Sequence, residues 1–269
     1  MHATHLVNVA HAKALEVYRD SDNSEGLIGI SLNLNPIYPK TDSSLNNEAA
    51  TIIDGFTNRW YLDPVFKGTY PSDTLALLEK YFNFPSIPNE DLQLLKANRS
   101  DFLGINNYTS TRANLNKPIK RPTDFYKIIM PGKPEKGVEV SDMGWEVFPD
   151  GLYDLLKRVD RDYEHPLIYI TENGMAGKDE IFVGKVVQDD DRLSYLQRYF
   201  EAASRAINKG VDLKGYFVWS LMDNFEWLWG YSKRFGIIRV EFETQERIWK
   251  KSALWYRDVI MKNGFDFQS

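Results

Sequence analysis

The amino-acid sequence predicts an α/β fold in which parallel strands alternate with helices. Residues 167–174 (LIYITENG) carry mostly apolar side chains up to Glu172 and end in a glycine turn, as expected of a buried strand with an acid at its tip. Helical patterns lie between this segment and three similar ones. Because strands that alternate with helices pair in parallel through right-handed crossovers, the pattern indicates one parallel sheet covered by helices.

Four segments are predicted to be strands of this sheet, and each ends in polar or aromatic residues. They are residues 26–33, 101–108, 166–172 and 213–220. Two shorter apolar runs, 181–187 and 236–242, are better explained as loop strands or a hairpin than as further strands of the sheet.

Helices are predicted where apolar side chains recur at helical spacing, beginning with residues 2–19. The further helical segments are 45–60, 73–82, 89–97, 149–163, 191–209 and 251–262. Gly210 and the pair Asn263-Gly264 supply stop signals for the last two. The stretch 112–144 is rich in proline and glycine and is predicted to be a loop.

A parallel sheet with helices on its outer face is the plan of the TIM (β/α)8 barrel, whose catalytic side chains project from the carboxyl ends of the strands. Eight strand–helix units in 269 residues would need about 34 residues each, whereas the four segments begin near residues 27, 101, 166 and 214. We therefore expect four parallel strands with surrounding helices and long connecting loops. It is predicted to form a single domain over residues 1–269.

The composition argues against several classes of partner. Lys and Arg total 33 against 38 Asp and Glu, so no basic surface for nucleic acid or anionic membrane is expected. No apolar stretch approaches the ~20 residues that span a bilayer, and no secretion signal precedes the first helix, which favours a cytoplasmic location. With no cysteine, and with four histidines that lack metal-ligand spacing, we expect no metal and no cofactor.

Polar and aromatic side chains gather at the predicted strand tips. They are Asn33, Asn106 with Tyr108, Glu172 with Asn173, and the segment 219–227 (WSLMDNFEW). Carboxylates and amides bind sugar hydroxyls, and aromatic rings stack on the C–H faces of sugars. The combination indicates carbohydrate chemistry.

Two of these segments, 170–174 (ITENG) and 219–227, resemble the signatures of glycoside hydrolase family 1, the retaining β-glucosidases. Further similar segments follow in the family's order and extend the likeness over essentially the whole chain: 59–64, 68–71, 104–108, 144–145, 230–231 and 234–236. The resemblance implies hydrolysis of terminal β-D-glucosyl residues by double displacement on a TIM (β/α)8 barrel. It further implies that this chain is a half-barrel, because the likeness covers strands five to eight only.

The resemblance also implies the roles of two catalytic residues. Glu172 resembles the family's nucleophile, and Tyr108 resembles the tyrosine that hydrogen-bonds this carboxylate and keeps it ionised and oriented. A strand-end glutamate taken alone would as readily serve in a structural salt bridge. The surrounding motif favours the nucleophile.

Five further residues are implied to bind substrate. Asn106 resembles part of the polar floor of the site, Glu226 and Trp227 resemble the pair that grips the outer hydroxyls of the sugar, Trp219 the stacking platform, and Phe235 a pocket wall. Family members that act on 6-phosphorylated sugars generally replace the glutamate, because a carboxylate repels phosphate. The presence of Glu226 therefore favours unphosphorylated β-glucosides, with glucose, galactose and fucose configurations left open.

One carboxyl group is missing from this pattern. A retaining glycosidase needs two, ~5 to 5.5 Å apart. The resemblance places the general acid/base in an Asn-Glu-Pro motif before a helix similar to residues 5–18, and the chain contains no such motif. Glu226 resembles a hydroxyl-binding residue rather than a substitute acid, and Asp223, Glu146 and Asp142 are expected to be solvated or helix-capping charges. Structural roles are expected for the four histidines.

Two functions remain open. The chain is either the C-terminal half of a β-glucosidase, competent when the N-terminal half is supplied, or a carbohydrate-binding or structural half-barrel without turnover. In both cases four strands leave two open sheet edges and an uncovered interior, which favours association with a complementary N-terminal half-barrel or with a second copy.

Overall fold

A computed structural model describes residues 1–21, 25–129 and 134–266 of the chain. Its centre is a four-stranded parallel sheet with the strand order β1-β3-β5-β8. The strands are β1 (Ile30–Asn33), β3 (Phe102–Asn106), β5 (Leu167–Asn173) and β8 (Leu213–Val218). The predicted α/β fold and all four predicted sheet strands are confirmed, although β1 is shorter than expected.

One face of the sheet is covered by α7 (Pro149–Asp162), α8 (Asp190–Asn208) and α9 (Lys251–Lys262). Alternate strand residues, such as Ile105 and Ile170, are fully buried and pack in one apolar cluster with α7 and α8. Because side chains alternate across a strand, the intervening residues point to the opposite face. The sequence alternation thus fixes which face carries the helices.

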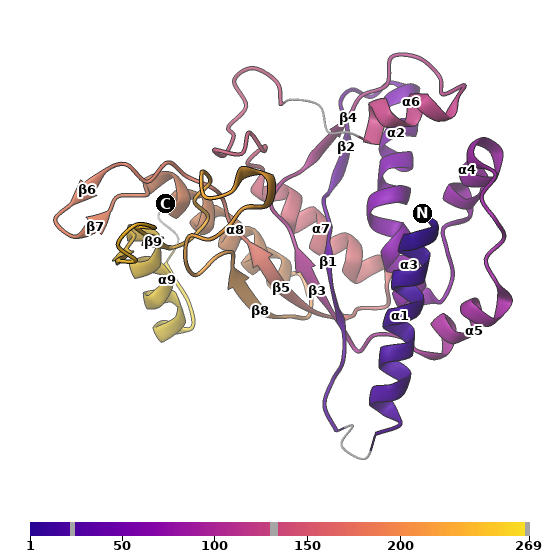
Figure 1. Ribbon diagram of the computed structural model, residues 1–269, viewed down its shortest axis with the longest axis horizontal. Coiled ribbons are helices and arrows are strands. Elements are labelled where there is room, and N and C mark those ends of the chain that lie inside the picture. The colour runs from indigo at the N-terminus through magenta and orange to yellow at the C-terminus, as the bar shows by residue number, and fades with distance from the viewer. Residues whose placement is uncertain (22–24, 130–133, 267–269) are drawn as a thin grey trace.

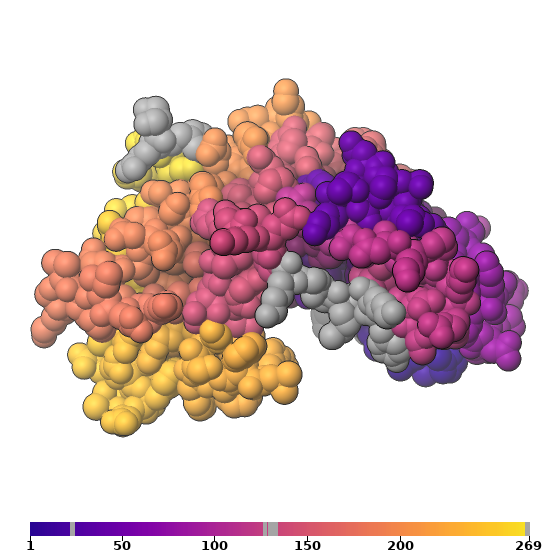
Figure 2. All heavy atoms as spheres, turned by 90° about the horizontal axis from the view of Figure 1, so that it is seen from above, coloured from indigo at the N-terminus to yellow at the C-terminus, as the bar shows by residue number. Residues whose placement is uncertain are grey.

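A second layer of helices lies beside β1, around the fully buried Trp60 (Figure 1). These helices are α1 (His2–Arg19), α2 (Ser44–Asp54), α3 (Trp60–Lys67), α4 (Ser72–Phe82) and α5 (Asn89–Ala97). The indole ring lies 4.4 Å from the ring of Tyr70, centre to centre, and its Nε1 donates to the hydroxyl of Thr4 on α1. The N-terminal and C-terminal segments lie at opposite ends of the molecule, as Figure 2 shows.

Two predictions about local structure were incomplete. The helix expected over 45–60 does not end there but continues through a π-helical turn (Gly55–Arg59) into α3. The stretch 112–144 is not a continuous loop: β4 (Thr111–Ala113) pairs in parallel with β2 (Ile37–Pro39), and Pro122 begins the helix α6 (Pro122–Ile129). Proline at the first helical position is well tolerated, which explains the misreading. Residues 130–133 of that predicted loop lie outside the described residues.

The two short apolar runs form hairpins at the margin of the sheet, as expected. The strands β6 (Phe182–Val183) and β7 (Val186–Val187) pair antiparallel. The strand β9 (Ile238–Val240) pairs antiparallel with β10 (Arg247–Trp249), and a 3-10 turn (Trp227–Trp229) precedes them. Neither run extends the central sheet.

The face of the sheet that the helices leave free is partly aromatic. Phe102 contacts Tyr169 edge to face at 5.6 Å between ring centres, and Phe217 of β8 is 56% exposed. In the described part of the chain, β1 and β8 each pair with only one sheet neighbour. No helix there is both long and apolar enough to cross a membrane.

Candidate active site

The side chains of Glu172 and Tyr108 meet at the carboxyl ends of β5 and β3. The hydroxyl of Tyr108 donates a short hydrogen bond to Oε2 of Glu172. Burial, and then the neighbouring carboxylates of Glu172 and Glu226, raise the pKa of the Tyr108 phenol well above its usual range. The phenol therefore stays protonated and serves as a permanent donor to the carboxylate.

Backbone hydrogen bonds hold the segment around Glu172 to the residues directly after β3 and directly after β8. The amide of Asn107 donates to the carbonyl of Glu172 at 2.9 Å, and the amide of Trp219 donates to the carbonyl of Asn173, also at 2.9 Å. The side chain of Asn173 is fully buried, where it donates to the hydroxyl of Tyr195 at 3.0 Å. These bonds fix the strand end from which Glu172 projects.

Aromatic rings surround the Tyr108 ring. The ring centres of Trp145 and Phe235 lie 5.7 and 6.0 Å from it, both edge to face. Phe235 is buried, and its ring centre is 6.0 Å from that of Trp145. Phe235, the predicted pocket wall, therefore lies beside Tyr108, which is the hydrogen-bond partner of the predicted nucleophile Glu172.

Glu226 lies within electrostatic reach of the Tyr108–Glu172 pair. Its pKa is raised by partial burial and then by the charge of Glu172. Trp227, in contrast, is 80% exposed. The structure thus brings Glu226 toward the predicted site and leaves the indole of Trp227 open to solvent on the loop after β8.

Asn106 and Trp219 lie at strand tips that flank Glu172. The register of β3 and β5 places Asn106 directly opposite Glu172, and the amide oxygen of Asn106 accepts a 2.6 Å hydrogen bond from Thr171. Trp219 is half-buried directly after β8, and its peptide bond to Ser220 is cis. All seven predicted site residues come from β3, β5 and β8 or the loops that follow them.

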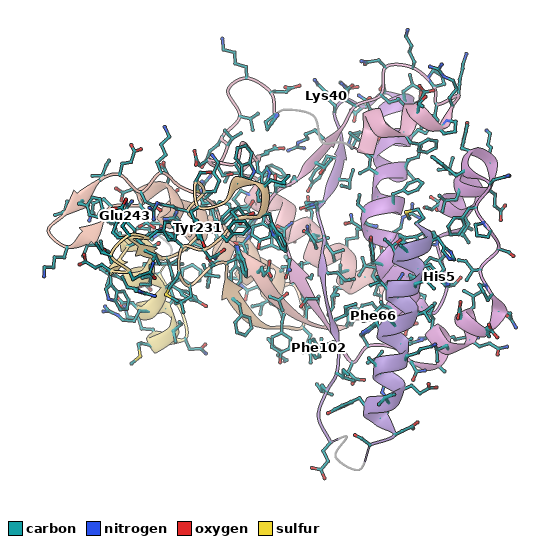
Figure 3. The ribbon with its side chains drawn as sticks, in the orientation of Figure 1. His5, Lys40, Phe66, Phe102, Tyr231 and Glu243 are labelled. Atoms are coloured by element: carbon teal, nitrogen blue, oxygen red, sulfur yellow. The ribbon has the colours of Figure 1, made fainter. Side chains whose placement is uncertain are left out.

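A cleft of about 570 Å³ opens beside Tyr108 and Trp145, at the carboxyl end of β1 and β3. Its lining includes Asn33, Lys40 and Arg112. Figure 3 shows Lys40 near the top of the molecule, well above Phe102, which begins β3. The cleft therefore lies at the end of the sheet where parallel-strand folds of this kind place their ligands.

The expectation that Asp223, Glu146 and Asp142 are solvated or capping charges was wrong. Asp223 and Glu146 are buried. The carboxylate of Glu146 pairs with Arg112 at 2.8 Å, and that of Asp142 pairs with Lys233 at 2.9 Å. Each acid is paired because an isolated charge in such surroundings would be costly.

Three of the histidines make structural contacts, as expected from their spacing. His5 is buried between the hydroxyl of Tyr70 and the carboxylate of Asp91, His11 bonds the hydroxyl of Ser100, and His165 bonds Asp160. Over residues 1–21, 25–129 and 134–266, no group of three or more His, Asp or Glu side chains is arranged to hold a metal ion.

Two contributors to the site had no predicted role. Trp145 packs against both Tyr108 and Phe235, and Arg192 of α8 donates to the carbonyls of Met175 and Arg234. The pair Gly144-Trp145 was evident in the sequence, but only as a matching segment. Arg192 sits within an ordinary helical pattern, so its contacts with two loops far away in the sequence left no local signal.

Comparison with known proteins places this geometry in a family. A model of glycosyl hydrolase family 1 matches residues 1–265. Beta-glucosidase A of Acetivibrio thermocellus is 43% identical, over 98% of this chain and 58% of its own length. A 6-phospho-beta-galactosidase of Clostridium acetobutylicum is 39% identical, over 95% of this chain and 57% of its own length.

Solved structures agree with the sequence relatives. A beta-glucosidase from Exiguobacterium marinum superposes with a TM-score of 0.87 at 42% identity, over 97% of this chain and 57% of that chain. The family 1 β-glucosidase from Thermotoga maritima gives 0.88 at 36% identity, over 98% of this chain and 57% of that chain. The chain spans somewhat more than half the length of these relatives. It belongs to glycosyl hydrolase family 1.

Proposed function

We propose that this chain supplies the nucleophile-bearing part of a retaining β-glucosidase. The observation that carries the proposal is the hydrogen bond from Tyr108 to Glu172 within a cluster of aromatic and amide side chains at the carboxyl ends of β3 and β5. Similarity to beta-glucosidases over nearly the whole chain supports it.

In the proposed reaction, an oxygen of the Glu172 carboxylate attacks the anomeric carbon of a β-glucoside. The bond from that carbon to the leaving-group oxygen breaks, the leaving group takes a proton from a general acid, and a glucosyl ester of Glu172 forms. The group that served as the general acid then takes a proton from water. The water oxygen attacks the anomeric carbon, which releases glucose and regenerates the Glu172 carboxylate. Tyr108 holds the attacking oxygen in place through its hydrogen bond.

The proposed substrate is an unphosphorylated β-glucoside. Glu226 lies close enough to Glu172 for the charge of Glu172 to raise the pKa of Glu226, and a carboxylate at that place can accept hydrogen bonds from sugar hydroxyls. A 6-phosphate there would meet like charge. The relatives include both beta-glucosidases and 6-phospho-beta-galactosidases, and the choice between these substrate classes is proposed here on the charge of Glu226.

The second carboxyl group, the general acid/base, is proposed to come from a complementary N-terminal half-barrel that completes the site. The open edges of β1 and β8 and the exposed Phe217 support such a partner. A second copy of the chain is the alternative occupant. It would close the barrel around a twofold axis without adding the missing motif.

A fluorinated inactivator tests the proposal and separates it from a non-catalytic carbohydrate-binding half-barrel. A 2-deoxy-2-fluoro-β-glucoside with a dinitrophenolate leaving group needs little acid assistance, so Glu172 should form a stable glucosyl adduct even without the acid. Mass spectrometry of the intact chain and of its peptides should place one adduct on Glu172, and none in Glu172→Gln. Sugar binding without any adduct would instead support the non-catalytic alternative.

A further inference from the structure

We propose that a buried ion network centred on Asp223 and Arg192 positions the active site, by locking the loop after β8 to the loop that follows Glu172. Asp223 and Arg192 are positioning residues for glucosyl transfer to Glu172, and this assignment rests on the proposed function. Neither touches the nucleophile. Asp223 holds the loop whose Phe235 packs on Tyr108, and Arg192 holds the loop that follows Glu172.

Asp223 organises the loop after β8. Its carboxylate is fully buried and accepts four hydrogen bonds: from Nζ of Lys250 at 2.9 Å, from Arg234 at 2.6 Å, and from the backbone amides of Gly236 at 3.0 Å and Val240 at 3.3 Å. One side chain thereby folds residues 223–240 onto the start of α9. The same loop carries Glu226 and Phe235.

Arg192 connects this loop to the loop after β5. It is buried near the first turn of α8, where it pairs with Asp179 at 2.7 Å and with Asp189 at 2.6 Å. Its guanidinium also donates to the carbonyls of Met175 at 3.2 Å and Arg234 at 2.8 Å. Met175 lies three residues after Glu172, and Arg234 directly precedes Phe235.

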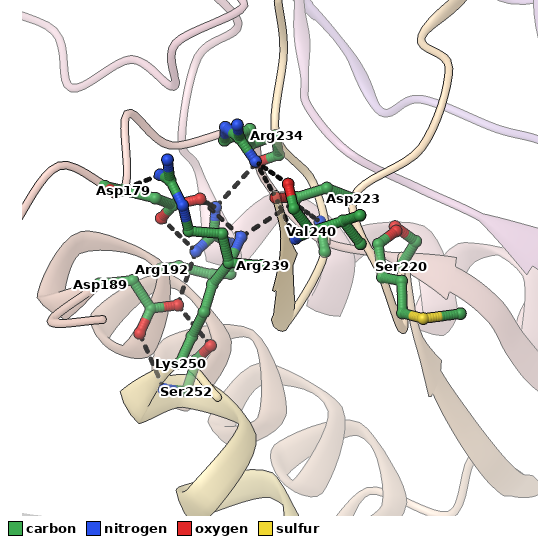
Figure 4. A network of polar contacts seen from close by, with 12 residues as sticks. Asp179, Asp189, Arg192, Ser220, Asp223, Arg234, Arg239, Val240, Lys250 and Ser252 are labelled. Carbon is green, nitrogen blue, oxygen red and sulfur yellow. Dashed lines mark hydrogen bonds and ion pairs between the residues drawn. The ribbon is translucent and has the colours of Figure 1, made fainter. Parts of the chain in front are cut away.

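The network closes through α9. Nζ of Lys250 bridges Asp179 and Asp223, and Asp189 accepts hydrogen bonds from the amide and hydroxyl of Ser252 (Figure 4). Three carboxylates and three cations therefore balance in charge: Asp179, Asp189 and Asp223 against Arg192, Arg234 and Lys250. The arrangement joins the loop after β5, α8, the loop after β8 and the start of α9.

A purely structural role explains this arrangement poorly. Buried ion pairs contribute little net stability compared with apolar side chains of similar volume, although breaking one is costly. What the network does provide is fixed geometry, since each carboxylate and guanidinium is bound from several directions. The geometry leads to the nucleophile by a short route: Arg234 to Phe235, Phe235 against the ring of Tyr108, and Tyr108 to Glu172.

The test is the rate at which the fluorinated glucoside labels Glu172. Asp223→Asn is nearly isosteric but loses the charge that Lys250 and Arg234 bind. We expect labelling at saturating inactivator to slow about 10- to 100-fold, because small displacements of reacting groups have effects of this size. Hydrogen exchange should rise in residues 224–236 while residues 102–106 remain as in the unmodified chain.

Two further variants separate positioning from stability. Asp223→Asn combined with Lys250→Met restores the charge balance, and we expect it to unfold like the unmodified chain yet label slowly. Asp54→Asn breaks a comparable ion network, in which Asp54 at the end of α2 is bound by Arg158 and Arg59, outside the loops that follow β5 and β8, and should leave the labelling rate unchanged.

The proposal is overturned if the double variant labels at the unmodified rate, if Asp54→Asn slows labelling as much as Asp223→Asn, or if exchange in residues 224–236 is unaltered. Absence of labelling in the unmodified chain would instead overturn the proposed function. In that case hydrogen exchange alone decides whether Asp223 holds the loop.

Discussion

At the scale of single residues, the contact between Tyr108 and Glu172 is the feature that supports the proposed role of Glu172 as nucleophile. The phenol is buried and its pKa is raised, so it donates a proton to the hydrogen bond without competing for negative charge. Trp145 and Phe235 hold the ring edge to face, which fixes the direction of the donor. Tyr108 thus donates the hydrogen bond, and its packed ring sets the position from which the hydroxyl reaches Glu172.

Tyr108→Phe should slow labelling of Glu172 by the fluorinated glucoside about 10- to 100-fold, because a hydrogen bond to a charged group contributes about 1.5–3 kcal/mol. The ring and its packing remain, so the free energy of unfolding should change little. Stopped-flow release of dinitrophenolate measures the rate. Tyr18→Phe on α1 is a matched control, and equal rates in the two variants would contradict the role of Tyr108.

The raised pKa of Glu226 predicts an effect of pH on stability. The folded state binds this proton more tightly than the unfolded chain does, so the stability of the fold decreases as pH rises from the ordinary glutamate pKa through the raised one. Glu226→Gln removes the carboxylate whose ionisation lowers the stability of the fold. Its Tm should exceed that of the unmodified chain at pH 7, and the difference should vanish below about pH 4.

Glu201→Gln, on the exposed face of α8, is the control variant for that comparison. Scanning calorimetry at several pH values measures both variants. A Tm of Glu226→Gln below that of the unmodified chain at neutral pH would contradict the prediction.

The sequence allowed Glu172 and its environment to be predicted because the chemistry is local. The strand, the acid and the turn are consecutive, and the register of β3 and β5 then brings Asn106 opposite Glu172. Asp223 was misjudged because its partners Arg234 and Lys250 lie 11 and 27 positions away and become neighbours only after the loop folds. The catalytic and binding roles themselves remain predictions.

At the scale of secondary structure, helices and strands with regular apolar spacing were predicted well, and segments with irregular backbone were not. The π-helical turn at Gly55–Arg59 lets α2 continue into α3, which no periodicity of 3.6 residues indicates. Pro122 was read as a loop residue although it begins α6. Proline is tolerated at that first helical position, so its presence does not exclude a helix.

Tryptophans on two elements should respond differently to truncation. Trp60 of α3 is fully buried against Tyr70 and Phe84, so Trp60→Ala should lower the free energy of unfolding by about 3–5 kcal/mol. Trp227→Ala, at an exposed position, should change it by less than about 0.5 kcal/mol. Urea unfolding followed by circular dichroism tests both, and similar losses would contradict the assignment.

At the scale of the whole molecule, the open sheet predicts association. Phe217→Glu places a charge on the uncovered face and should weaken self-association or binding of a complementary half about 10- to 100-fold, since burial of a Phe side chain contributes about 1.5–3 kcal/mol. Sedimentation velocity over a range of concentrations measures this. Val17→Glu on α1, also exposed, should have no effect, and a chain that is monomeric at all concentrations would contradict the prediction.

The two apolar clusters described for the fold have a consequence for how the molecule comes apart. One surrounds the sheet with α7 and α8, the other surrounds Trp60, and Tyr61 packs against both. Heating should therefore melt α1, α2, α4 and α5 as one cooperative unit while the sheet layer, to which Leu62 of α3 also belongs, persists to a higher temperature. Tyr61 links the two transitions, so its truncation to Ala should move them further apart in a calorimetric trace.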